Sequence, residues 1–199
     1  MRALEALSER NQGRREQHLE WLRTVDGRRV FAIDETGSHI AMLPARGWAP
    51  KGQRMHETVP RNRGTVLTII GALTTQGLTA VMTVEGGTSG DVFLAYVNEV
   101  LLPEMQRGDI VLMDNLGAHR DHRVLKAFED AGINVHFQPP YSPEFNPIEL
   151  AWAKVKWFLR LAKARTYEAL NTAVAMAMDM IEPPEAEAYF THCGFNQDG

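Results

Sequence analysis

Three acidic residues stand where carboxylates could do chemistry together. Asp34 lies in the apolar run 29–35 (RVFAIDE), and Asp114 ends a second apolar run, 109–114 (DIVLMD). Glu149 follows a proline-rich segment at the start of a predicted helix. If the two apolar runs form neighbouring strands, the two aspartates lie side by side at one end of a sheet, and the glutamate reaches them from the first helical turn.

Carboxylates brought close together repel one another and raise one another's pKa unless a cation neutralises them. Hard oxygen ligands with open coordination positions suit Mg²⁺ or Mn²⁺. Two such ions can activate a water or hydroxyl and stabilise the departing oxygen of a phosphodiester. We therefore predict that Asp34, Asp114 and Glu149 are catalytic residues and ligands of two divalent ions in phosphoryl transfer.

Each acid also has a purely structural interpretation. The run Asn146-Pro147-Ile148-Glu149 fits a variant capping box, in which Glu149 only bonds back to the helix start. Asp114 and Asn115 fit an Asx turn after a strand, and Asp34 fits a solvated strand end. The sequence leaves these interpretations open for each acid taken singly, but all three would have to hold at once.

The hydrophobic pattern predicts an α/β domain in which helices cover a central mixed sheet. We expect strands over 29–35, 65–74, 78–84, 109–114 and 133–137, and helices over 90–101, 120–131, 147–162, 167–181 and about 185–190. Residues 1–28 are expected to form an N-terminal helical or linker segment before a catalytic domain at 29–199. Residues 36–64 are rich in Gly, Pro, Arg and Lys and should form an arm inserted in that domain.

The net charge of -4 is unevenly distributed. Segment 39–64 has five Lys or Arg residues against one Glu, segment 151–165 has five and no acid, and segment 166–199 has six acids and no Lys or Arg. Basic stretches of this kind bind nucleic-acid phosphates or form solvated faces, and the sequence favours neither for a stretch taken alone. The candidate DNA contacts beside Glu149 form one basic face of a predicted helix, with Lys154, Lys156, Arg160 and Lys163.

Composition excludes several other classes of protein. The single cysteine, Cys193, rules out an internal disulfide framework, and no Cys/His cluster has zinc spacing. Segment 1–17 is charged and lacks the apolar run of a secretory signal, and the longest apolar stretch, 66–73, is too short to span a bilayer. We expect a soluble, cytoplasmic protein without a membrane partner.

Three motifs resemble one known family. They are Ile33-Asp34-Glu35, then Met113-Asp114-Asn115 with His119 four residues later, then the run 139–149 (PPYSPEFNPIE). The chain is similar in these motifs to the mariner superfamily of DDE transposases and their bacterial insertion-sequence relatives. The 34 residues between the second and third acids match the spacing of that family, and the resemblance runs from about residue 30 to 195.

The resemblance implies a ribonuclease H-like fold with Asp34, Asp114 and Glu149 as the catalytic triad. It also implies Mg²⁺-dependent cleavage of DNA at transposon ends, strand transfer of the freed 3′-hydroxyl into target DNA, and a homodimer. The arm sits where mariner-like enzymes place a loop that reaches the partner subunit. We therefore expect its residues Arg46, Trp48 and Lys51 to contact DNA or a second protomer, unless the arm is only a flexible surface loop. His119 either lies near the metal site or DNA, or bonds locally at a helix start.

The chain departs from this family at its N-terminal end. Full-length relatives carry a helix-turn-helix region that reads the inverted repeats of the element, and segment 1–28 cannot hold it. We expect a separate N-terminal helix-turn-helix portion or a truncated copy. The alternatives are a nuclease that cuts without joining, and a catalytically silent or regulatory fragment that binds DNA or full-length transposase.

Overall fold

A mixed five-stranded sheet forms the centre of the computed structural model, which describes residues 8–44, 48–54, 56 and 58–196. The strands lie in the order β3-β2-β1-β4-β5. Their bounds are β1 Val30–Ser38, β2 Leu67–Thr74, β3 Gly77–Glu85, β4 Ile110–Met113 and β5 Asn134–Phe137. The central strand β1 pairs antiparallel with β2 and parallel with β4, so the sheet is mixed as predicted.

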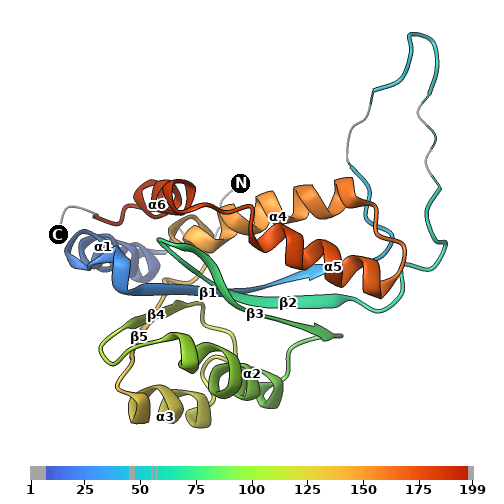
Figure 1. Cartoon of the computed structure of the whole chain (residues 1–199). Helices are drawn as coiled ribbons and strands as arrows, with labels where there is room; N and C mark the ends of the chain where they lie inside the picture. Colours follow the sequence, from blue (N-terminus) through green and yellow to red (C-terminus); the bar gives the residue numbers. More distant parts are fainter. Residues whose placement is uncertain (1–7, 45–47, 55, 57, 197–199) are drawn as a thin grey trace.

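Helices cover both faces of the sheet (Figure 1). One face carries α1 (Glu9–Thr24), α4 (Pro147–Ala162), α5 (Tyr167–Met178) and α6 (Pro183–His192), and the other carries α2 (Gly90–Tyr96) and α3 (His122–Ala131). The sheet separates two hydrophobic clusters. The larger one contains Leu22 of α1, Trp152 of α4 and Phe190 of α6, and the smaller one contains Phe93 and Phe128. Because Leu22 is fully buried, α1 packs as part of the domain.

Local sequence explains why the central strands form. Seven of the eight residues of β2 (LTIIGALT) are buried, as expected for a strand that has helices over both faces. The turn into β3 passes through Gly77, whose φ of 120° is a conformation that other residues rarely adopt. A side chain there would also collide with the carbonyl oxygen of Ile181, 2.6 Å from the ideal Cβ position. No helix in the described part of the chain is long and apolar enough to cross a membrane.

The first strand is longer than predicted. It continues to Ser38 because its pairing with β2 extends to the pair Ser38 and Leu67, whereas its pairing with β4 ends at Ala32 and Leu112. Asp34 therefore lies in the middle of β1, just beyond the point where β4 separates from it. The arm accordingly spans residues 39–66, and its described residues extend away from the sheet (Figure 1).

Helix boundaries also differ from the predicted ones. The helix expected over 90–101 is α-helical only to Tyr96 and then continues as a π-helical turn, Val97–Leu101. The helix expected from Arg120 begins at His122 instead, because the Asp121 side chain caps it by accepting a hydrogen bond from the backbone of the second helical residue. The last helix is longer than expected and starts at Pro183, a residue that favours the first helical turn.

Candidate active site

The three predicted acids line one cavity of about 480 Å³. Asp34 comes from β1, Asp114 directly follows β4, and Glu149 lies in the first turn of α4. The parallel pairing of β1 with β4 sets the two aspartates on adjacent strands. The proline-rich loop 139–143 also lines this cavity.

A glycine lets α4 approach the sheet at this point. Gly71 of β2 is paired with Asp34, and an ideal Cβ at Gly71 would lie 3.1 Å from the ring of Trp152. Trp152 is only 2% exposed and packs into the larger core cluster. Since Glu149 lies three residues before Trp152 on the same side of the helix, this close packing directs Glu149 toward Asp34.

Burial and the neighbouring acids raise the pKa of the Asp34 carboxyl group. Burial, followed by the charge of Glu149, raises its pKa from 3.8 to about 7, and the charges of Glu35 and Asp114 act in the same direction. The site therefore carries more negative charge than its surroundings can neutralise. A bound cation would remove that cost.

A buried histidine holds the second aspartate. The Nδ1 atom of His119 lies 2.7 Å from Oδ1 of Asp114, and its Nε2 atom lies 3.3 Å from the Glu35 carboxylate. Burial alone would lower the pKa of His119, but its hydrogen bonds to these two carboxylates raise it to about 9. Burial would raise the pKa of Asp114, and its hydrogen bonds from His119 and from the Leu116 backbone lower it. The raised pKa favours the protonated ring, and the hydrogen bond between His119 and Asp114 orients the aspartate.

Of the alternatives for His119, the structure places its ring beside Asp114, one of the predicted metal ligands. The ring is fully buried and packs 4.3 Å from the ring of Phe93. It also precedes α3 instead of starting it. The sequence did not identify Glu35 as its partner, because the two residues are 84 positions apart and only the pairing of β1 beside β4 brings them together.

The structural alternatives for the acids have different outcomes. The Asx turn is present, since the backbone N–H of Leu116 donates to Asp114 Oδ1 at 2.9 Å, but the same carboxylate lines the cavity. The capping box is not formed, because the Asn146 side chain makes no capping hydrogen bond at α4. Its Nδ2 atom instead donates to the carbonyl oxygen of Ile33 at 3.5 Å, which ties the start of α4 to β1.

The donor set fits a divalent cation, although the three acids do not converge on a single point. Among the described residues, no three His, Cys, Asp or Glu side chains form a ready-made metal cluster. The shared cavity and the raised pKa of Asp34 nevertheless supply what such an ion needs: hard oxygen ligands and uncompensated negative charge.

The predicted DNA contacts divide into several groups. In the arm, Trp48 is fully exposed and Lys51 is exposed, whereas Arg46 lies outside the described residues. On α4, Lys156 and Arg160 lie one turn apart and are partly exposed. Lys163 follows the helix in a left-handed conformation, with φ of 50°.

Lys154 does not share that face of α4, which corrects the prediction of a single basic face. Helical spacing turns it to the opposite side from Lys156 and Arg160. There its ammonium donates to the carbonyl oxygen of Met180 at 2.7 Å and forms an ion pair with Glu185 of α6. It links two helices of the domain.

One further contact shapes the site and has no signal in the sequence. Arg15 of α1 donates to Ser142 Oγ at 2.5 Å, forms a 2.7 Å ion pair with Glu144, and lies 4.8 Å from the ring centre of Phe145. These contacts attach α1 to the proline-rich loop that walls the cavity. The partners are more than 120 residues apart, so no local pattern could have revealed them.

Acids gathered over the central strands of a mixed sheet, with helices on both faces, are the arrangement that the predicted ribonuclease H-like fold requires. A family model of DDE superfamily endonucleases matches residues 29–171. The chain belongs to this family, as its motifs predicted.

Solved structures of the Mos1 mariner transposase share the fold. The Mos1 paired-end complex with the left transposon end has a TM-score of 0.76 and 19% sequence identity, over 94% of this chain and 60% of that chain. The Mos1 paired-end complex with Mn has a TM-score of 0.74 at 19% identity and the same coverage, 94% and 60%. The Mos1 catalytic domain alone gives 0.64 at 16% identity, over 96% of this chain and 97% of that chain.

These likenesses confirm the expected ribonuclease H-like fold. The chain spans about 60% of the length of the Mos1 chains in the paired-end complexes. No curated protein matches the chain in sequence.

Proposed function

We propose that this chain is the catalytic domain of a transposase, which cuts DNA strands at transposon ends and joins the freed 3′-hydroxyl to target DNA. The observation that carries the proposal is the shared cavity of Asp34, Asp114 and Glu149 in a chain of the DDE endonuclease family. The similar Mos1 structures include complexes with a transposon end, with Mn and with Mg. Their fold supports DNA as the substrate and divalent ions as the cofactor.

The three acids would hold Mg²⁺ or Mn²⁺, in our proposal two ions. When bound, such ions activate the attacking water or 3′-hydroxyl and neutralise charge on the departing oxygen. The imidazolium of His119 and the backbone N–H of Leu116 fix one oxygen of Asp114, which leaves the other for an ion. A bound cation would favour the ionised form of Asp34, whose pKa is raised in the metal-free chain, and Glu149 would reach the ion from the first turn of α4.

Plasmid nicking tests the proposal. Purified wild-type protein and Asp114→Asn are incubated with supercoiled plasmid in Mg²⁺, in Mn²⁺ and in EDTA. We expect nicking by the wild type only, and only with metal. Joining is measured separately with a precut DNA end that offers a free 3′-hydroxyl, because a nuclease that only cuts would fail this second assay.

A negative result is made informative by measuring metal binding directly. Titration of Mn²⁺ by calorimetry is compared between the wild type and Asp114→Asn. Absence of both Mn²⁺ binding and nicking, even with a helix-turn-helix portion supplied in trans, would favour the catalytically silent or regulatory fragment.

The partly exposed cations of α4 are the proposed phosphate contacts outside the cavity. Replacing Lys156 and Arg160 by Gln should weaken binding to every DNA sequence and reduce the salt dependence of binding by about two phosphate contacts. Lys126→Gln, on α3 across the sheet, is the matched control. Lys154 would contribute only if its ion pair with Glu185 opened. An unchanged salt dependence in the double variant would contradict this role.

The arm is the proposed contact to a second protomer or to DNA. Trp48 is fully exposed there, and an exposed tryptophan next to the cation Lys51 suits either surface. Replacing residues 44–60 by a short Gly-Ser linker should abolish dimerisation, DNA binding or both. The two are measured by light scattering and by fluorescence anisotropy. If neither changes, the arm has no such role.

A further inference from the structure

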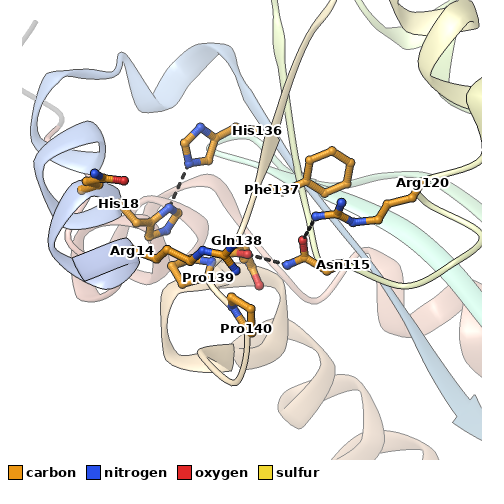
Figure 2. A pocket seen from close by; sticks show the side chains of 10 residues that line it. Arg14, His18, Asn115, Arg120, His136, Phe137, Gln138, Pro139 and Pro140 are labelled. Atoms are coloured by element: carbon orange, nitrogen blue, oxygen red, sulfur yellow. Dashed lines mark hydrogen bonds between the residues drawn. The ribbon is translucent and has the colours of Figure 1, made fainter. Parts of the chain in front are cut away.

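A second cavity, of about 260 Å³, opens beside the candidate active site, between α1 and the end of β5 (Figure 2). No Asp or Glu is among the residues that line it, whereas the neighbouring cavity contains all three acids. The two cavities share Asn115, Gln138, Pro139 and Pro140 as lining residues. A ligand bound in this second cavity therefore lies directly next to whatever occupies the acids.

Two arginines from distant parts of the chain line this cavity. Figure 2 shows Arg14 on the α1 side and Arg120 on the other side, with Gln138 and Pro139 between them. The guanidinium of Arg120 is already oriented, because it lies 4.7 Å from the ring centre of Phe137 and donates to the side-chain oxygen of Asn115. Arg14 is exposed, and within the described chain it has no ion-pair partner. Two guanidinium groups without a facing carboxylate make an anion site.

Buried polar atoms without partners also line the cavity. The Nε2 atom of Gln138 and the Nε2 atom of His18 are buried and have no hydrogen-bond partner, and the two residues are 5% and 3% exposed. An unsatisfied buried polar atom destabilises the fold, and a ligand with acceptor oxygens would offset that cost. The second ring nitrogen of His18 is taken, since its Nδ1 lies 2.9 Å from Nε2 of His136. When His136 donates in that bond, His18 presents an N–H at Nε2.

We propose that this cavity binds a backbone phosphate of the DNA strand being cut, next to the phosphate at the acids, with Arg14 and Arg120 as its charged donors. Of two consecutive phosphates of one strand, one would then lie in the acidic cavity that requires a metal, and the next would lie in the basic cavity. This inference rests on the proposed strand-cutting function, because only a strand that passes the acids brings a second phosphate to this place.

The first test measures the salt dependence of DNA binding in EDTA, so that cleavage does not interfere. Binding of a fluorescein-labelled DNA duplex is followed by anisotropy for the wild type, Arg14→Gln, Arg14→Lys and Arg23→Gln. Arg23 is exposed on the same helix and, about two and a half turns away, faces the opposite side. We expect the slope of log K against log salt to fall by about one for Arg14→Gln and to stay unchanged for Arg14→Lys and Arg23→Gln. A wild-type slope in Arg14→Gln, or an equal fall in Arg23→Gln, would overturn the proposal.

The second test locates the phosphate. Single neutral methylphosphonates are placed one by one along a DNA strand that ends in a 3′-hydroxyl. At one position, the neutral methylphosphonate should weaken binding to the wild type and should not weaken binding to Arg14→Gln any further. If no position behaves this way and inorganic phosphate alone competes with DNA, the cavity takes a free anion and the proposal fails.

The outcomes separate this inference from the proposed function. If Arg14→Gln reduces the salt slope but the wild type shows no metal-dependent nicking, the phosphate site is supported and the proposed cleavage is not. Nicking with a wild-type salt slope in Arg14→Gln would keep cleavage and reject the phosphate site.

Discussion

The carboxylate of Asp34 should destabilise the metal-free protein, so that its replacement by Asn raises the free energy of unfolding. In the folded chain, burial and the charge of Glu149 raise its pKa from 3.8 to about 7. At about 1.4 kcal/mol per pH unit, this difference corresponds to at most about 4 kcal/mol at alkaline pH. Because water entering the open cavity screens these charges, we expect a gain of about 1–3 kcal/mol for Asp34→Asn.

The pH dependence has a definite sign. Below the unfolded-state pKa of 3.8, the folded and unfolded chains both carry the proton, and Asp34 contributes nothing. Between 3.8 and about 7 the folded chain binds more protons, so this contribution lowers stability as pH rises, and above about 7 the full cost is present. The Asp34→Asn variant lacks this decline in stability with rising pH.

Urea unfolding followed by circular dichroism in EDTA measures the effect. The difference between Asp34→Asn and the wild type should be near zero at about pH 4 and reach its full size at about pH 8. Mg²⁺ or Mn²⁺ should then stabilise the wild type and leave the variant unaffected. A variant that is less stable than the wild type at about pH 8, or a difference independent of pH, would refute the close approach of the acids.

Three other substitutions test the packing around the site by urea unfolding. Gly71→Ala places a methyl group against Trp152. It should lower the free energy of unfolding by about 1–3 kcal/mol and reduce nicking by displacing α4. The loss of stability should be smaller in a Trp152→Phe background, and an equal loss there would contradict the proposed contact. His119→Gln removes the buried cation beside Asp114. It should lower the free energy of unfolding by about 3 kcal/mol and also abolish nicking, whereas wild-type stability would argue against an imidazolium. Leu22→Ala should cost about 2–5 kcal/mol, and a loss well below that range would mean that α1 is a detachable linker.

Local patterns in the sequence predicted the elements that carry the acids. The apolar runs before Asp34 and Asp114 are strands because few other short elements suit uninterrupted burial. The apolar stripe after Glu149 is a helix because its period matches the helical turn. Each of these signals is contained within a few consecutive residues. The spacing of the three motifs then indicated that the three acids belong to one site.

Contacts between distant segments could not be predicted in the same way. The extension of β1 to Ser38 depends on pairing with β2, whose register no local pattern reports. The burial of His119 depends on Phe93 and Glu35, which lie on other elements. Lys154 looked like a surface cation because its partner, Glu185, is 31 residues away. In each case the partner, and not the residue type, decides the role.

The packing of α4 has a consequence for the protein during its synthesis. The buried stripe of this helix shares its core cluster with Ala177 of α5 and Phe190 of α6, which the ribosome makes after Glu149. Until those segments emerge, the stripe has no cover on that side, and α4 is held only by its contacts with the sheet, such as Trp152 on Gly71 and Asn146 on Ile33. A nascent chain that already contains all three acids therefore lacks part of the packing around α4 until α5 and α6 have left the exit tunnel.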